Sequence, residues 1–178
     1  MLYGESINFN IFKLTKEYLS MVENFTCGND EIDKYLKTKA FEDLEFGNSF
    51  TRIIINKDNN ELIGYYSINC SSIVMENYNH RYFSPAIEIK MFALSEKYQG
   101  IKLSNEDDDM FSDQILCEII SKIVGITEAY ISARSIILYS VPKAKSFYER
   151  NGFEAFVEYM LSSDDMYIKD CIPMWFQL

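Results

Sequence analysis

A glutamate on an apolar strand is the first residue here that could carry chemistry. Glu88 lies in segment 86–94, whose β-branched and aromatic residues predict a β-strand. Side chains alternate along a strand, so Glu88, Lys90 and Phe92 are expected on one face. A carboxylate there could take a proton from a nucleophile, directly or through water. The alternative is a solvent-facing glutamate that pairs with Lys90, and the residue type alone does not decide between them.

A glycine turn follows this strand and precedes a helix. Gln99-Gly100 forms the turn, and Ser112 is a suitable N-cap for the helix, whose predicted end is Gly125. A strand-loop-helix unit presents backbone N–H groups and the positive end of the helix to a phosphate group. The acidic segment 104–110 would repel such an anion. We therefore expect this segment to point outward, with Lys102 and the N–H groups near Ser112 turned inward.

The charge balance argues against a polyanionic partner. The 178 residues carry 17 Lys plus Arg against 27 Asp plus Glu, a formal net charge of −10. Binding to nucleic acid through phosphates requires a basic footprint, which the whole chain does not offer. A local basic patch would still permit tRNA binding, so nucleic acid is disfavoured as a partner without being excluded.

Metal chemistry and membrane insertion are not expected either. The four cysteines are widely separated, no pair has CxxC spacing, and His80 is the only histidine. These features argue against a zinc site, and we interpret His80 as a surface loop residue and the cysteines as buried, reduced thiols. No apolar run approaches the ~20 residues that span a bilayer, and charges interrupt the first twenty residues. The expected location is the cytoplasm, with no membrane partner.

The elements that must position these residues are predicted as one domain, residues 1–178. Strands are expected at 10–14, 51–56, 62–73, 86–94, 136–140, 153–160 and 173–178. Helices are expected at 15–21 with Thr15 as cap, from Asn29 to 44, at 112–125 and at 142–150. This mixture predicts an α/β (α+β) fold, with a mixed, curved central sheet flanked by helices.

Four motifs, in this order, resemble one known superfamily. They are Phe25-Thr26-Cys27-Gly28-Asn29, Gly64-Tyr65-Tyr66-Ser67, the run from Phe92 to Gly100 and the run from Ala144 to Phe153. The set resembles the GNAT acetyltransferases and covers the chain from Phe25 to its C-terminus. It is similar to the branch that includes the acetyltransferase toxins of bacterial toxin–antitoxin modules. No single motif is specific, but the ordered set of four is a fairly strong signal.

The resemblance implies two catalytic residues. Tyr148 corresponds to a tyrosine that often lies near the coenzyme sulfur in GNAT enzymes and protonates the departing thiolate. Its alternative role is to pack the helix on the sheet. Glu88 stands where histone-type GNAT enzymes carry a catalytic base, whereas the toxin-type branch usually has an apolar residue there. The implied reaction is direct attack of an amine on acetyl-CoA, without a metal.

The resemblance also implies a set of residues that bind acetyl-CoA. The strand backbone would hold the pantetheine arm and polarise the acetyl carbonyl, and the following loop, the next helix and two lysines would face the phosphates. The residues are Phe92, Ala93, Leu94, Gln99, Gly100, Ile101, Lys102, Ser112, Lys143 and Lys145. The family's second loop glycine is missing after Gly100, which places the pyrophosphate contacts in question.

Three functions remain open at this point. The leading hypothesis is an N-acetyltransferase acting on a primary amine of a small molecule or a protein. The first alternative is a toxin-type aminoacyl-tRNA acetyltransferase, and the second is a GNAT-fold binding protein without turnover. The sequence does not identify the acceptor amine, an antitoxin partner or the oligomeric state, and a homodimer remains open.

Overall fold

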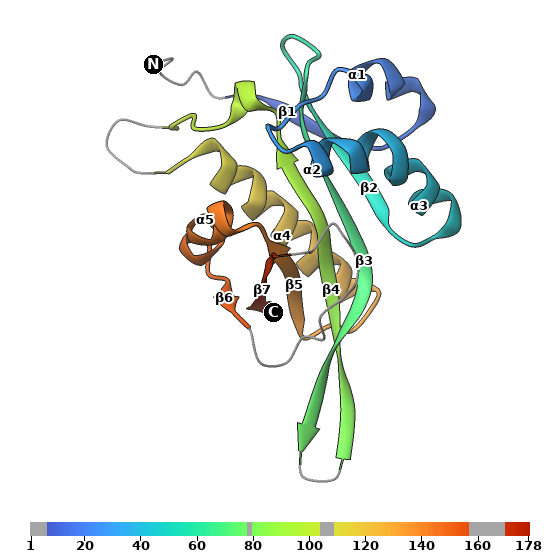
Figure 1. The fold of residues 1–178 in the computed structure, drawn as a ribbon, viewed down its shortest axis with the longest axis vertical. Helices are drawn as coiled ribbons and strands as arrows, with labels where there is room; N and C mark the ends of the chain where they lie inside the picture. Colours follow the sequence, from blue (N-terminus) through green and yellow to red (C-terminus); the bar gives the residue numbers. More distant parts are fainter. Residues whose placement is uncertain (1–6, 78–79, 104–108, 157–169) are drawn as a thin grey trace. The chain divides into compact units, whose positions relative to one another are not determined.

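The computed structural model describes residues 7–77, 80–103, 109–156 and 170–178 (Figure 1). Two compact units make up the chain. The first contains Met1–Ile68 and Met91–Ile115, and the second contains Asn69–Lys90 and Leu116–Leu178. Strands β3 (Leu62–Asn77) and β4 (His80–Leu94) and helix α4 (Phe111–Ala129) contribute residues to both units.

The strands form one mixed sheet, as predicted. Besides β3 and β4 it contains β1 (Phe9–Lys13), β2 (Phe50–Asn56), β5 (Ser135–Ser140), β6 (Glu154–Ala155) and β7 (Ile172–Gln177). The hydrogen-bonded order is β1-β2-β3-β4-β5-β7-β6. Strands β4 and β5 are parallel, and the pairs β1–β2, β2–β3, β5–β7 and β6–β7 are antiparallel. The predicted α/β (α+β) class is confirmed.

In the first unit, helices follow β1 and precede β2. They are a 3-10 turn (Lys16–Tyr18), α1 (Leu19–Glu23), α2 (Asp30–Lys34), a π-helical turn (Tyr35–Lys39) and α3 (Ala40–Phe46). Asn29 caps α2 as predicted, because its side chain accepts hydrogen bonds from the amides of Glu31 and Ile32. Thr15 makes no such bond, so its predicted capping role is wrong.

Tyrosine and aspartate side chains join the helices of this unit to its strands. Tyr35 is fully buried and donates a hydrogen bond to Asp43 Oδ2 at 2.9 Å. Tyr65 of β3 donates to the backbone oxygen of Ile32 at 2.7 Å. Its ring stacks on Tyr35 with the centroids 6.4 Å apart. These buried polar groups therefore have partners, as the low dielectric of a core requires.

The second unit contains the part of β3 and β4 between Asn69 and Lys90, most of α4, and the whole of α5 (Lys145–Arg150). Alternate residues of its strands are buried in the core together with one face of α4. These residues are Ile87, Ile89, Leu116, Ile119, Ile123, Ile136, Leu138 and Met174. Pairing of β4 with β5 runs from Ala86–Ser135 to Ile89–Leu138, and β4 then continues to Leu94.

Several predicted boundaries are wrong, and one pattern explains them. β3 and β4 extend as a long hairpin to Asn77 and from His80, so His80 is an exposed strand residue and not a loop residue. The segment was not predicted as strand because many of its residues are polar. Paired strands tolerate polar side chains that face solvent. Helix α4 begins at Phe111 and continues past Gly125 to Ala129. Strand β6 ends at Ala155, and part of the predicted strand 153–160 lies outside the described residues.

Candidate active site

Strand β4 presents the candidate base and the candidate coenzyme-binding backbone with the predicted alternation. Ile89, Met91 and Ala93 are buried, whereas Glu88 and Phe92 are half-buried. Glu88 belongs to the second unit, and the backbone of Phe92 to Leu94 belongs to the first.

No helix of the described chain is long and apolar enough to cross a membrane.

A glycine of β3 permits a close approach to the end of β4. A Cβ atom added to Gly64 would lie 2.3 Å from the backbone oxygen of Ala93 and 2.8 Å from Leu94 Cδ2. Only glycine fits there without displacement of the backbone. Just beyond, the amide of Ser95 donates to the backbone oxygen of Ile63 at 2.8 Å. Gly64 thus fixes the position of the strand end that the resemblance assigns to coenzyme binding.

Gln99 joins two of the sequence motifs. Its Nε2 donates to the backbone oxygens of Leu94 at 2.8 Å and Cys27 at 2.9 Å. The amide of Glu96 donates to the backbone oxygen of Thr26 at 3.1 Å. Gly100 follows with φ of 70°, a conformation that favours glycine. The motif at 25–29 and the run 92–100 therefore converge at the end of β4.

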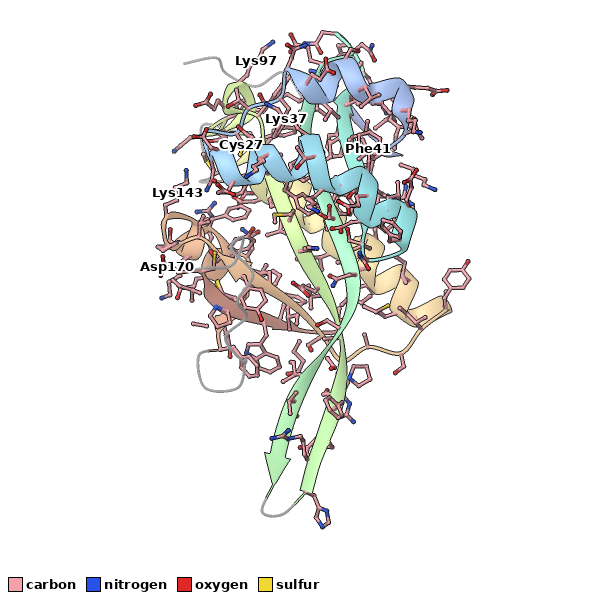
Figure 2. All side chains as sticks on the ribbon, turned by 45° about the vertical axis from the view of Figure 1, so that its right-hand side comes forward. Cys27, Lys37, Phe41, Lys97, Lys143 and Asp170 are labelled. Atoms are coloured by element: carbon pink, nitrogen blue, oxygen red, sulfur yellow. The ribbon has the colours of Figure 1, made fainter. Side chains whose placement is uncertain are left out.

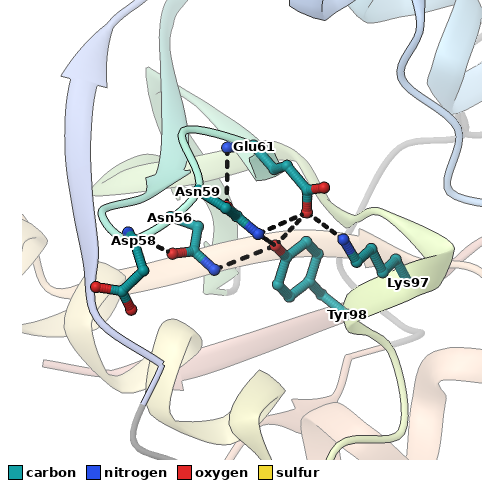
Figure 3. A network of polar contacts seen from close by, with 6 residues as sticks. All are labelled: Asn56, Asp58, Asn59, Glu61, Lys97 and Tyr98. Carbon is teal, nitrogen blue, oxygen red and sulfur yellow. Dashed lines mark hydrogen bonds and ion pairs between the residues drawn. The ribbon is translucent and has the colours of Figure 1, made fainter.

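A polar network holds the short 3-10 helix Glu96–Tyr98 against the β2–β3 turn (Figure 3). The hydroxyl of Tyr98 donates to Glu61 Oε2 at 2.8 Å and accepts from Asn56 Nδ2 at 3.2 Å. Lys97 also pairs with Glu61. The hydrogen bonds from Lys97 and then Tyr98 lower the pKa of Glu61. This network orients the segment that leads into Gln99.

The start of α4 differs from its expected form. Ser112 lies inside the helix, and the cap is built instead by Asp113, whose Oδ2 accepts from the amide of Met110 at 2.9 Å. The amide of Phe111 donates to the backbone oxygen of Ile101 at 2.9 Å, and the amide of Leu103 donates to the backbone oxygen of Asp109 at 3.0 Å. These amides are engaged within the protein.

The flanking residues complete this loop. Lys102, an exposed residue, forms a β-bridge with Met110. Residues 104–108 of the acidic segment 104–110 lie outside the described residues. The outward course expected of this segment therefore stays a prediction. The carboxylate of Asp113 bonds one of the amides at the helix start, where the sequence suggested an anion would bind.

Tyr148 lies in the second unit, on α5, and is buried. Its ring makes edge-to-face contacts with Phe147 and Phe153, with centroid distances of 4.9 and 5.7 Å. Burial, and then the charge of the Cys171 thiolate, raises the pKa of Tyr148. The phenol therefore remains protonated at neutral pH, and it can donate a proton or a hydrogen bond.

The two candidate lysines flank the start of α5. Lys143 is exposed in the 3-10 turn Pro142–Ala144 (Figure 2). Lys145 forms an ion pair with Glu149 at 2.7 Å. Among the cysteines only Cys27 is buried; Cys171 is half-buried and the remaining two are exposed, which corrects the sequence interpretation.

Asn69 and Tyr139 are neighbours of Glu88 that the sequence did not predict. Its Oε2 accepts a hydrogen bond from Nδ2 of Asn69 on β3 at 3.2 Å. On β5, burial and then the charge of Glu88 raise the pKa of Tyr139. Glu88 pairs with Ile137, so Tyr139, two residues further, shares its face of the sheet. The period of β5 was visible in the sequence, but its register against β4 was not.

The site residues therefore fall into four groups, two in each unit. In the first unit, Leu94 and Gln99 lie with Cys27, while Ile101 and Lys102 lie with the start of α4. In the second unit, Glu88 belongs to a polar group and Tyr148 to an aromatic cluster. The described residues contain no cluster of metal-ligating side chains.

The sequence matches no known family model and no curated protein. Solved structures do match in fold. A structure of AtaTR bound with AcCoA is 15% identical, with a TM-score of 0.72, over 95% of this chain and 93% of that one. A tyrosine-to-phenylalanine mutant of KacT is 14% identical, with a TM-score of 0.69, over 95% and 94%. AtaT complexed with acetyl-methionyl-tRNA is 14% identical, with a TM-score of 0.68, over 96% and 95%.

Other matching structures contain the antitoxin AtaR or DNA. The similarity covers nearly the whole length of each chain, so it concerns the entire fold. The fold of this chain is thus the GNAT fold, as the sequence resemblance predicted.

Proposed function

We propose that this chain is an acetyl-CoA-dependent N-acetyltransferase that acts on a primary amine. The observation that carries the proposal is the convergence of the motifs 25–29 and 92–100 at the end of β4, within a fold that matches AtaTR bound with AcCoA. Fold similarity alone does not establish activity, because one fold can host several functions. Chemical support for the proposal comes from the roles that the residues of β4 and α5 can take in the reaction.

The reaction needs a base, an acid and a polarised thioester. Glu88 takes a proton from the amine, whose nitrogen attacks the acetyl carbonyl. The C–N bond forms, the C–S bond breaks, and Tyr148 donates a proton to the departing thiolate. The amides from Phe92 through Ala93 to Leu94 hold the pantetheine arm and polarise the carbonyl. The backbone oxygen of Leu94 already accepts a hydrogen bond from Gln99 Nε2, which supports the strand end before substrate binds.

Within the first unit, the phosphates of the coenzyme are assigned to the loop Gln99 to Lys102 and to Ser112. The sequence resemblance adds Lys143 and Lys145 of the second unit. Because the amides of Leu103 and Phe111 are bonded within the protein, lysine side chains must contribute more than the helix start does. Lys143 is the stronger of the two candidates, since Lys145 is already paired with Glu149.

Acetyl-CoA binding is the first test. Calorimetry should give a dissociation constant in the micromolar range, about −8 kcal/mol. The matched measurement with Lys143→Ala should show weaker binding, whereas Lys37→Ala, at an exposed position of the first unit (Figure 2), should not. Absence of binding by the native protein at millimolar acetyl-CoA would refute the enzyme function. Binding without any acetyl transfer would favour the non-catalytic alternative.

A second candidate acceptor is aminoacyl-tRNA. The fold similarity to AtaT complexed with acetyl-methionyl-tRNA favours it, and the net charge of −10 opposes it. Incubation of the protein with labelled acetyl-CoA and charged tRNA, with free amines in parallel, separates the two. Transfer to tRNA that is lost in Tyr148→Phe would establish the tRNA acceptor and make an antitoxin partner the next subject to test.

A further inference from the structure

We infer that Asn69, Glu88 and Tyr139 form the binding site for the acceptor amine, and that this site selects monoamines that carry an apolar group. The inference rests on the proposed acetyl transfer, and it names an acceptor site within the second unit. Its three residues come from the neighbouring strands β3, β4 and β5.

Asn69 provides the clearest evidence for a ligand. Its Nδ2 donates to Glu88 Oε2, and because a carboxylate only accepts hydrogen bonds, the orientation of the carboxamide is fixed. Its Oδ1 is then buried and accepts no hydrogen bond from the described residues. Buried acceptors in proteins nearly always have a donor. An amine supplies N–H donors that Oδ1 could accept.

Glu88 and Tyr139 add two further acceptors. Both are half-buried, and they share one face of the sheet because Glu88 pairs with Ile137 in the parallel ladder. A protonated amine brings three N–H groups, one for each of these oxygens. After Glu88 has taken one proton, Asn69 and Tyr139 still hold the neutral amine by its remaining hydrogens, and the nitrogen lone pair is left for attack.

The half-buried rings of Phe156 and Trp175 form an apolar floor beside these acceptors. They pack against the buried side chains of Ile73, Ala86 and Ile137, which lie on the same face of the sheet. The rings of Phe156 and Trp175 lie 5.8 Å apart with an interplanar angle of 33°. Trp175 is directly opposite Ile137 in the β5–β7 pair. Such a floor suits an acceptor with an aromatic or aliphatic group near its amine.

The apolar floor also sets the selectivity against diamines. An acceptor with a second ammonium group would have to desolvate that charge against the rings of Phe156 and Trp175, which disfavours it. The predicted order of acceptors therefore places 2-phenylethylamine ahead of 1,4-diaminobutane.

The test measures amine binding without requiring turnover. NMR titration of the full chain should show saturable binding of 2-phenylethylamine, at least tenfold tighter than 1,4-diaminobutane. Asn69→Leu and Tyr139→Phe should each weaken it fivefold or more. The matched control is Cys70→Ala, next to Asn69 but exposed on the opposite face. The melting temperature of Asn69→Leu should change little, because the loss of the hydrogen bond to Glu88 is offset by the removal of a buried acceptor without a donor.

The outcomes separate this site from the proposed function. Loss of amine affinity in both variants at unchanged stability supports the site. Unchanged affinity in both variants, or no binding of 2-phenylethylamine by the native protein, overturns it. If the amine binds as expected but acetyl transfer is absent, the site stands and the proposed acetyltransferase function fails. If transfer occurs with an unchanged KM for the amine in both variants, the function stands and the site is refuted.

Discussion

Replacement of Tyr148 by phenylalanine tests the proposed mechanism most directly. The substitution removes the hydroxyl and keeps the ring between Phe147 and Phe153, whose centroids lie 4.9 and 5.7 Å away. Packing is therefore retained, and the free energy of unfolding should change by no more than about 1.5 kcal/mol, the usual contribution of one hydrogen bond. A large loss of stability would show that the hydroxyl has a structural role.

The expected loss of rate follows from the burial of the phenol. General acids contribute roughly 10²- to 10⁴-fold to enzymatic rates. Burial raises the pKa of Tyr148, which makes it a weaker acid, so the lower end of that range applies. We expect kcat to fall about 10²-fold, or about 2.7 kcal/mol in activation free energy, with the affinity for acetyl-CoA unchanged.

Thiol release from acetyl-CoA, followed with the best acceptor amine, measures this effect. The matched control is Tyr130→Phe, because Tyr130 is 84% exposed and belongs to no candidate group. Full activity of Tyr148→Phe would refute the assigned role of the hydroxyl and leave Tyr148 as a packing residue. Equal losses in both variants would show that the assay reports a general effect of removing a tyrosine.

The raised pKa of Tyr148 also predicts the dependence of stability on pH. The folded state favours the neutral phenol, so its stabilising contribution is complete below the unfolded pKa of about 10. It is lost as the pH rises above that value, because only the unfolded chain then releases the proton. Urea unfolding should accordingly show a steeper loss of stability above pH 10 for the native protein than for Tyr148→Phe. Parallel curves would contradict the burial effect.

Three further predictions address other residues. Glu88→Gln should shift the pH–rate profile toward higher pH, since solvent must then deprotonate the amine, and an unchanged profile would exclude Glu88 as the base. Gly64→Ala should lower the free energy of unfolding by about 1–3 kcal/mol and weaken acetyl-CoA binding, because its Cβ would lie 2.3 Å from the backbone oxygen of Ala93. Iodoacetamide at pH 8 should alkylate exposed Cys70 before Cys171, whose pKa is raised by burial, and mass spectrometry would reveal the reverse order if this reasoning is wrong.

Local patterns in the sequence predicted most of the elements. The β-branched run 51–56 forms the predicted strand, which pairs with β3, and Asn29 caps α2. These features depend on residues close together in the chain, which propensity and capping describe well. Boundaries that depend on distant partners were wrong. His80 is in a strand because β4, the neighbour of β3 in the sheet, begins there. The predicted start of α4 was also wrong, although its cap is local: Asp113, next to Ser112, accepts from the amide of Met110.

The sequence by itself determined which chemistry was available: a carboxylate on one face of a strand, a tyrosine in a motif of the GNAT type, and a glycine turn before a helix. Only the tertiary structure decided what surrounds these groups. Gln99 binds the backbone of Cys27, and Asn69 and Tyr139 flank Glu88. The positions of Asn69 and Tyr139 beside Glu88 depend on strand register, because a shift of one residue moves every side chain of a strand to the other face. Register is set by the packing of the whole sheet, and a single sequence does not specify it locally.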